Sequence, residues 1–354
     1  MKALTNLDLE QIKKLHSIYS EEIPECVLEV IDSIPMKKIG EIGQNCGRDY
    51  LADCFQKFSY NYSRKTHSIG VALIVWRFTK NIKMTLAGLF HDIAAPTFSH
   101  VIDFFNGDSE TQESTEELTE RIISKSSEIQ KVLAKYNLTT KDVCDYSMYP
   151  VADNKSPKLS ADRLEYTSYM STAMGLISFT DLRKLIEDIY IANVDGTDEM
   201  CFRTQKYAKK FAEIAIECGR FMSSPLSNIA NKFLADTLKV AVDEKVLTED
   251  DFNTLTEDEL IKKMEASKNL KVLKYWNTFK TFSKVWDSYK EDKENYCINV
   301  KVKNRYINPL CDVDGKVIRI ADLDTEIKEN IEDFISTANT KYCVMNVTRD
   351  YLRD

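Results

Sequence analysis

Apolar side chains recur every three or four residues along most of this chain, which is the spacing of amphipathic and buried α-helices. Helices are therefore predicted at 7–19, 63–80, 83–94 and 158–176, and over most of 179–290. The segment 63–80 is apolar around most of its circumference, as expected of a central, buried helix. Pro96 is expected to end the helix of 83–94, because proline disfavours helical angles in the residue before it.

Near the C-terminus the pattern changes from the helical period to the period of two that strands show. Residues 297–302 alternate, and two further apolar segments flank Asp314-Gly315, a pair typical of a hairpin turn. A last helix is expected at about 323–337 and a final strand at 342–347. The predicted fold class is mostly α, with a small antiparallel β-sheet near the C-terminus.

The chain has 354 residues, of which 43% are hydrophobic, and can therefore build a sizeable core. We expect a catalytic core at 1–180 and a helical C-terminal region at 181–354, with one continuous domain as the alternative. The net charge of −8 disfavours binding to nucleic-acid polymers or anionic membranes, which requires a basic surface. A small basic pocket for one nucleotide is still compatible with that charge.

The chain shows no sign of a membrane or secretory segment. No apolar run approaches the roughly 20 residues that span a bilayer, and the N-terminus lacks the apolar region of a signal peptide. Nine cysteines are scattered without a C-x-x-C pair, which indicates reduced thiols. We therefore expect a cytoplasmic protein.

The candidate chemistry lies where histidines gather. The chain has four histidines, and three of them, His67, His91 and His100, fall within 34 residues of one another. Asp92 follows His91 directly, and the two side chains can reach one ion near a helix end. On the later helix, Asp162 and Tyr166 are four residues apart and share one face.

Two imidazoles and two carboxylates form a mixed nitrogen and oxygen ligand set. Such a set suits a divalent transition metal, Mn, Fe, Co, Ni or Zn, and not calcium or a thiolate site. A metal of this kind lowers the pKa of a bound water and polarises a phosphoryl oxygen. The planar guanidinium groups of Arg64 and Arg163 are shaped to hold phosphate oxygens. The pattern thus favours metal-assisted hydrolysis of a phosphate compound.

His67, the pair His91-Asp92 and Asp162 resemble the H…HD…D signature of HD-domain metal-dependent phosphohydrolases. Residues 63–71 resemble the "R-x-E-H-S-x-G-V" segment of the deoxynucleoside triphosphate triphosphohydrolase branch. Residues 87–100 resemble its "AGL-x-HD…PFSH" segment, and 161–166 its "D-[KR]-x-[DE]-Y" segment. The resemblance covers about 36–170 and implies an all-helical HD core.

This resemblance assigns roles to single residues. It implies that His67, His91, Asp92 and Asp162 are the metal ligands. It further implies that Arg64, Arg163 and Tyr166 contact substrate phosphate or sugar, and that His100 lines the same pocket. We name Asp92, His100 and Glu113 as candidate catalytic residues. Without the resemblance, a core histidine at position 67 and a helix-start carboxylate at position 162 are the simpler interpretations.

The chain departs from that branch at two positions. The branch usually has a histidine three residues after the HD aspartate, where this chain has Ala95. It has another histidine in a "T-x-H-E" segment, where this chain has Gln112. The leaving group then needs another proton donor, and Glu113, Asp103 or metal-bound water are the candidates.

Two functional hypotheses follow. The first is a metal-dependent phosphohydrolase that acts on a nucleotide or related small phosphorylated metabolite through metal-activated water. The alternative is an HD-type regulatory module that binds metal and nucleotide with little or no turnover, which the residues at 95 and 112 motivate. We expect a homodimer from the habit of the branch and the aromatic-rich C-terminal helices.

Overall fold

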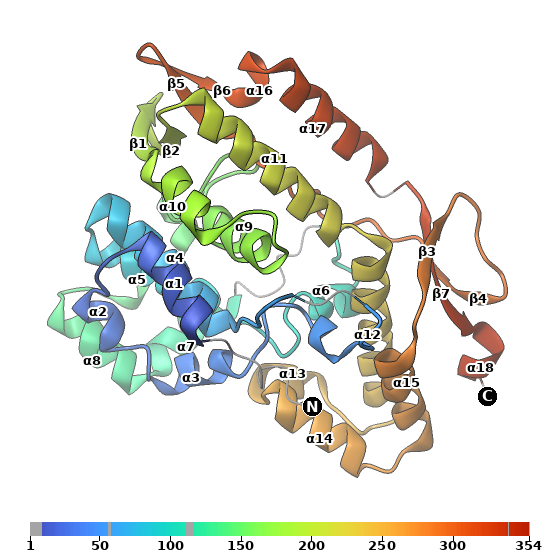
Figure 1. Cartoon of the computed structure of the whole chain (residues 1–354). Coiled ribbons are helices and arrows are strands. Elements are labelled where there is room, and N and C mark those ends of the chain that lie inside the picture. The colour runs from blue at the N-terminus through green and yellow to red at the C-terminus, as the bar shows by residue number, and fades with distance from the viewer. Residues whose placement is uncertain (1–8, 56–57, 111–116, 339, 354) are drawn as a thin grey trace.

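The computed structural model of the chain describes residues 9–55, 58–110, 117–338 and 340–353 (Figure 1). Over these residues the protein is mostly α-helical with two small β-sheets, and the predicted fold class is confirmed. Gln112 and Glu113 lie outside the described residues. No helix within the described ranges is both long and apolar enough to cross a membrane.

Two consecutive helices, α4 (Arg64–Thr79) and α5 (Ile82–Phe90), form the centre of the N-terminal half. The hydroxyl of Ser63 caps α4 by accepting a hydrogen bond from the backbone N–H of Thr66. Lys80 ends α4 in the left-handed conformation, and Asn81 caps α5 by accepting from the N–H of Met84. This short connection makes the two helices close neighbours, which brings their functional ends into one region.

Other helices surround this pair, and α9 (Ala161–Ala173) packs directly against α4. The remaining helical elements of the N-terminal half are α1 (Leu9–Tyr19), α2 (Glu25–Leu28), α3 (Ile34–Gly40), η1 (Arg48–Tyr50), α6 (Val101–Asn106), α7 (Glu117–Lys125), α8 (Ser127–Lys135), η2 (Thr140–Asp142) and η3 (Tyr146–Met148).

The C-terminal half contains further helices and both sheets (Figure 1). Its helices are α10 (Phe179–Glu187), α11 (Gln205–Met222), α12 (Pro225–Asp243), α13 (Glu249–Thr254), α14 (Glu257–Ala266), α15 (Leu270–Thr281), α16 (Ile320–Leu323), α17 (Thr325–Thr337) and α18 (Arg349–Arg353). Its strands are β1 (Ile189–Val194), β2 (Thr197–Phe202), β3 (Val285–Ser288), β4 (Asn295–Ile298), β5 (Leu310–Val313), β6 (Lys316–Arg319) and β7 (Tyr342–Thr348). One sheet has the order β1-β2-β5-β6 and the other β3-β7-β4.

The hairpin of β5 and β6 around Asp314-Gly315 and the final strand β7 confirm two of the predictions near the C-terminus. The alternating segment 297–302 is a strand only at its first two residues, because β4 ends at Ile298. The helical prediction for 179–290 is wrong at two places, because β1, β2 and β3 lie within that range. A short apolar run such as 189–192 fits a strand and a helix equally well. The turn decides, since Asp195 and Gly196 both have positive φ angles, of 52° and 79°, and reverse the chain.

The prediction for the end of α5 also needs correction. His91 and Asp92 were expected inside a helix of 83–94, but α5 ends at Phe90 and the chain continues in turns to Ala94. The N–H of Ala95 still bonds to the carbonyl of Asp92. Because the helix ends at Phe90, the consecutive side chains of His91 and Asp92 can turn toward the same point.

Two large hydrophobic clusters hold the molecule together. The first joins α4 and α5, through residues such as Leu73 and Leu89, to α11 and α17. The second joins Phe98 and Val101 to α12 and α15, where Trp276 is buried. Each cluster includes residues from both sides of position 180, where the domain boundary stays a prediction. Phe90 and Ile93, on either side of His91, belong to the first cluster, so the chain passes from the first cluster to the second between His91 and His100.

Candidate metal centre

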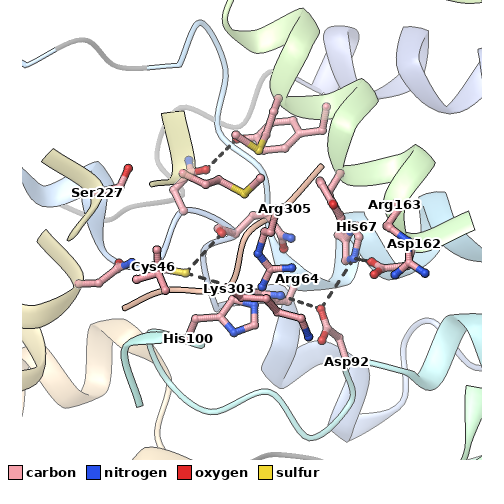
Figure 2. A pocket seen from close by; sticks show the side chains of 18 of the residues that line it. Cys46, Arg64, His67, Asp92, His100, Asp162, Arg163, Ser227, Lys303 and Arg305 are labelled. Carbon is pink, nitrogen blue, oxygen red and sulfur yellow. Dashed lines mark hydrogen bonds and ion pairs between the residues drawn. The ribbon is translucent and has the colours of Figure 1, made fainter. Parts of the chain in front are cut away.

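Three helices deliver three ligand-type side chains to one point. His67 comes from the first turn of α4, His91 directly follows α5, and Asp162 comes from the first turn of α9. His67 Nε2 lies 3.1 Å from Asp162 Oδ1 and 3.1 Å from His91 Nε2. All three ligand atoms lie within 4.8 Å of one another. Figure 2 shows His67 and Asp162 facing each other on one side of the pocket.

Asp92, the fourth predicted ligand, lies at the edge of this group. Its Oδ2 is 3.5 Å from His91 Nε2 and 3.9 Å from His67 Nε2. The same oxygen accepts a hydrogen bond of 2.8 Å from the guanidinium of Arg64. The carboxylate of Asp92 is therefore shared between the ligand group and a neighbouring cation.

The hydrogen bonds of the two imidazoles fix which nitrogen faces the centre. His91 Nδ1 lies 2.8 Å from the carbonyl oxygen of Gly88, and a carbonyl can only accept, so Nδ1 carries the proton. His67 Nδ1 likewise faces the carboxylate of Glu165. Both Nε2 atoms are then left to bind a metal, which is the arrangement of metal-ligating histidines in proteins.

Glu165 supports His67, a role that the sequence patterns did not assign to it. Its side chain is fully buried, contacts His67 and accepts a hydrogen bond of 2.8 Å from the hydroxyl of Tyr62. It packs against α4 where Gly70 leaves room, since a Cβ at that position would lie 2.6 Å from Glu165 Oε1. The signal was present, because Gly70 falls within the motif segment 63–71 and Glu165 within 161–166.

The charges at this centre suit a bound cation. Burial alone would raise the pKa of Asp162, but the hydrogen bond and positive charge of His67 hold it well below its usual range. Burial would likewise raise the pKa of Asp92, and Arg64 and the two imidazoles outweigh it and lower that pKa. Burial lowers the pKa of His67, but Glu165 and Asp162 raise it to about 10.

The donor set fits a divalent transition metal. Two imidazole nitrogens at 3.1 Å repel each other through their lone pairs unless a proton or another cation lies between them. Two nitrogens and one or two carboxylate oxygens are the ligands that metals from Mn to Zn accept. His67, His91, Asp162 and Asp92 would hold such an ion.

Arg64 lies directly beside the centre and is almost completely buried. Its Nη1 donates to Asp92 and its Nε donates to the hydroxyl of Ser99 at 2.9 Å. Phe98 and Ser99 are both in the left-handed region, with φ of 63° and 53°, which costs free energy in residues other than glycine. That strained turn places the Ser99 hydroxyl against Arg64 and leads into His100.

His100 also lines the pocket, on the side of α6. Its Nδ1 lies 2.9 Å from the buried carboxylate of Asp103, which fixes the ring and leaves Nε2 as the second polar atom. Burial lowers the pKa of His100. Neutral His100 can therefore accept a proton at Nε2, and its protonated form can donate one.

The remaining predicted substrate residues, Arg163 and Tyr166, line the same pocket. The guanidinium of Arg163 bonds to the carbonyl of Lys158 and to Asn154, and it lies 3.1 Å from Asp153 Oδ1. In this arrangement Arg163 holds the loop of 153–158 onto α9.

The metal ligands open onto a cavity of about 290 Å³. Much of its wall was not anticipated from the sequence, because it comes from the C-terminal half. Met222 at the end of α11 lines it, as do Ser227 and Asn231 of α12. Residues 302–306 also line the cavity. One sequence signal for this part of the wall is the basic pair Lys303 and Arg305, just beyond the alternating segment 297–302.

Comparisons with known sequences agree with this site. The HD domain family model matches residues 64–146, the range that contains His67, His91 and Asp92. The uncharacterized protein YdhJ of Bacillus subtilis (strain 168) is 26% identical over 314 residues, 88% of this chain and 92% of YdhJ. The metal-dependent phosphohydrolase cns2 of Cordyceps militaris is 29% identical over 174 residues. That match spans 49% of this chain and 48% of cns2.

Two solved structures share the fold over almost the whole chain. A hypothetical protein from Aquifex aeolicus has a TM-score of 0.64 at 18% identity, covering 94% of each chain. A phosphohydrolase from Bacteroides thetaiotaomicron VPI-5482 has a TM-score of 0.65 at 14% identity, covering 92% of this chain and 96% of its own. The arrangement of the N- and C-terminal halves therefore recurs in distant sequences.

Proposed function

We propose that this chain, whose residues 64–146 match the HD domain family model and which is similar over 174 residues to a metal-dependent phosphohydrolase, hydrolyses a small phosphorylated metabolite. One observation carries the proposal: His67, His91 and Asp162 converge with both imidazole Nε2 atoms directed at the same point. A divalent metal held there would lower the pKa of water and polarise a phosphoryl oxygen. Asp92 completes the ligand set in this proposal.

The side chains around the centre have complementary tasks. Arg64 is held by Asp92 and Ser99, and its charge stabilises the negative charge that develops on the phosphoryl oxygens. His100, oriented by Asp103, transfers a proton between Nε2 and the leaving oxygen. Arg163 positions the loop that borders the pocket, and Tyr166 contacts the substrate body. Glu113 stays a candidate outside the described residues.

We further propose that the substrate is a nucleotide and that the protein is a cytoplasmic homodimer. In each chain, residues 1–180 would form the catalytic core. The cavity of about 290 Å³ is near the lower limit of small-molecule sites, and aromatic, amide and basic side chains line it together. All nine cysteines are free thiols in the structure, which fits a reducing compartment.

The second candidate function is binding of metal and nucleotide without turnover. Ala95 supports it, because this buried residue stands three residues after Asp92 and its methyl group cannot donate a proton to the leaving group. If that candidate is right, His100 cannot replace the missing imidazole, and ligand leaves the protein intact.

The test is elemental analysis of protein purified without chelators, followed by a phosphate-release screen. The screen uses nucleoside mono-, di- and triphosphates and p-nitrophenyl phosphate, each with Mn²⁺, Co²⁺, Ni²⁺ and Fe²⁺. We expect close to one metal or more per chain and phosphate release that is lost in Asp162→Asn. Metal-loaded protein that releases phosphate from none of these compounds would favour the binding module. Protein that binds no metal would contradict both candidates.

A further inference from the structure

Residues 302–306, here called the crossing segment, connect the two sheets across the pocket. They lie between β4 and β5, more than 200 residues after His100 in the sequence. Val302, Lys303, Asn304, Arg305 and Tyr306 all line the cavity that contains the metal ligands. Figure 2 shows Lys303 and Arg305 in the pocket, with Arg64 and His100 nearby.

The backbone of the crossing segment is fixed in place by its neighbours. A Cβ at Gly219 of α11 would lie only 2.1 Å from the carbonyl oxygen of Arg305, so the close approach requires glycine there. The N–H of Asn308 donates to the carbonyl of Pro157 at 2.9 Å, and its side chain accepts from the N–H of Ala321 at 3.0 Å. Ile307 is buried. The position of Arg305 is therefore built into the fold.

The charge of Arg305 acts inside the pocket. It opposes protonation of His100 and favours ionisation of the Tyr166 hydroxyl, which places it within electrostatic reach of both side chains. The crossing segment thus adds two cationic residues, Lys303 and Arg305, to the wall of the cavity that contains His67, His91 and Asp162.

We propose that Arg305, assisted by Lys303, forms a second anion subsite, which binds an anionic group of the substrate other than the phosphate at the metal centre. The inference rests on the proposed function and deepens it. It makes the substrate a phosphorylated metabolite with at least two anionic groups, the second being a phosphate or a carboxylate. A guanidinium suits this task because its planar N–H groups bind an oxyanion with two parallel hydrogen bonds.

Binding of two inert probes tests the subsite. Methylphosphonate carries one anionic group and methylenediphosphonate carries two, and neither has a bond that a phosphohydrolase cleaves. Each is titrated calorimetrically into Mn²⁺-loaded protein at the same free Mn²⁺ concentration. We expect the diphosphonate to bind at least about 10-fold more tightly, the factor given by one charge-assisted hydrogen-bonded pair.

Arg305→Gln is expected to abolish that preference while changing methylphosphonate affinity and metal content less than about twofold. Arg305→Lys should keep part of the preference, and Lys303→Gln should reduce it to a smaller extent. Lys301→Gln is the matched control, because Lys301 is exposed on the same stretch and does not line the cavity.

An unchanged preference in Arg305→Gln would overturn the inference. An equal loss of affinity for both probes, with the metal retained, would also overturn it, because Arg305 would then support the pocket as a whole. A failure of the proposed function looks different. The protein would release no phosphate from any substrate, yet the ratio of the two probes would still report on Arg305.

Discussion

The two ends of one cavity are built in different ways. The metal end consists of His67, His91, Asp92 and Asp162, all held by buried partners of opposite charge or by backbone groups. The distal end consists of Met222, Ser227, Asn231 and the crossing segment. Its residues come from α11, α12 and a connection between sheets. In the proposed function, the first end would carry the chemistry and the second would face the rest of the substrate.

The two ends differ in whether their buried polar atoms have hydrogen-bond partners. Within the described residues, the side-chain carbonyl oxygen of Asn231, at the distal end, is buried and accepts no hydrogen bond. At the metal end, each imidazole Nδ1 has a partner. Buried acceptors without a partner are costly unless a ligand or water satisfies them. The comparison teaches that the ligand-type side chains of the metal end are already oriented by the fold, whereas the distal end keeps a buried acceptor that an N–H or O–H donor of a ligand could satisfy.

The strongest way to break this comparison is to remove a ligand. Asp162→Ala should weaken metal binding by at least about 100-fold, which exceeds the usual effect of residues that only orient ligands. Phosphate release should fall with it. Inductively coupled plasma analysis measures the metal content, and circular dichroism checks that the helices remain.

Asp32→Ala serves as control, because Asp32 is exposed and forms only a surface ion pair with Lys65. Retention of metal in Asp162→Ala at the wild-type level would remove Asp162 from the centre.

A smaller effect is expected from the support beneath His67. Glu165→Gln should lower metal affinity by about 10–100-fold, because a neutral amide fixes the imidazole less well and makes it a weaker ligand. Competition with a chromophoric chelator measures the affinity. Tyr62→Phe is the control, since it removes one hydrogen bond to Glu165 and leaves the contact with His67. Equal losses in the two variants would mean that Glu165 only supports packing.

The space that holds Glu165 can be probed through two glycines of the central helices. Gly70→Ala places a Cβ 2.6 Å from Glu165 Oε1, whereas the nearest side-chain atoms at Gly88 are 3.3 Å away on Val71 and Val75. We expect Gly70→Ala to cost about 1–3 kcal/mol of unfolding free energy and a few-fold of metal affinity. Gly88→Ala should be milder on both counts. Urea denaturation compares the two, and equal stability would show that Glu165 moves aside without loss.

Substitution of Glu257 is expected to have the smallest effect on metal binding and a separate effect on the free energy of unfolding. This buried carboxyl at the start of α14 accepts from the N–H of Gly43 and from the hydroxyl of Tyr50. It thereby ties α14 to the residues that precede α4. Burial, with a smaller contribution from Asp49, raises the pKa of Glu257 to about 7, although the hydrogen bonds from Gly43 and Tyr50 oppose this rise.

When the pKa of a carboxyl is higher in the folded than in the unfolded protein, the group stabilises the fold most at a pH below its ordinary pKa, where it is protonated in both states. The wild type should therefore lose stability as the pH rises from about 4.5 to about 7, by up to ~3 kcal/mol from this group. In Glu257→Gln this loss should disappear, with metal content unchanged. Urea midpoints at several pH values measure it, and parallel pH profiles for the two proteins would contradict the role of Glu257.

Much of the metal end could be predicted from sequence because local patterns encode it. The helical period, the cap at Ser63 and the spacing of His67 and His91 follow from residues close in the chain. The strands β1 and β2 could not be assigned, because a short apolar run such as that of β1 satisfies two periods at once. The end of α5 at Phe90 was missed for a related reason, since helix boundaries depend on the contacts of the last turn.

The sequence by itself determined the fold class and singled out His67, His91 and Asp162, which converge in the structure, because residue identities and spacings are local properties. Only the tertiary structure decided which imidazole nitrogen faces the centre, since Glu165 and the carbonyl of Gly88 set that choice through space. It also decided that Arg305 shares a cavity with His67. Packing across two hydrophobic clusters brings these residues together, and no local pattern records a contact between segments more than 200 residues apart.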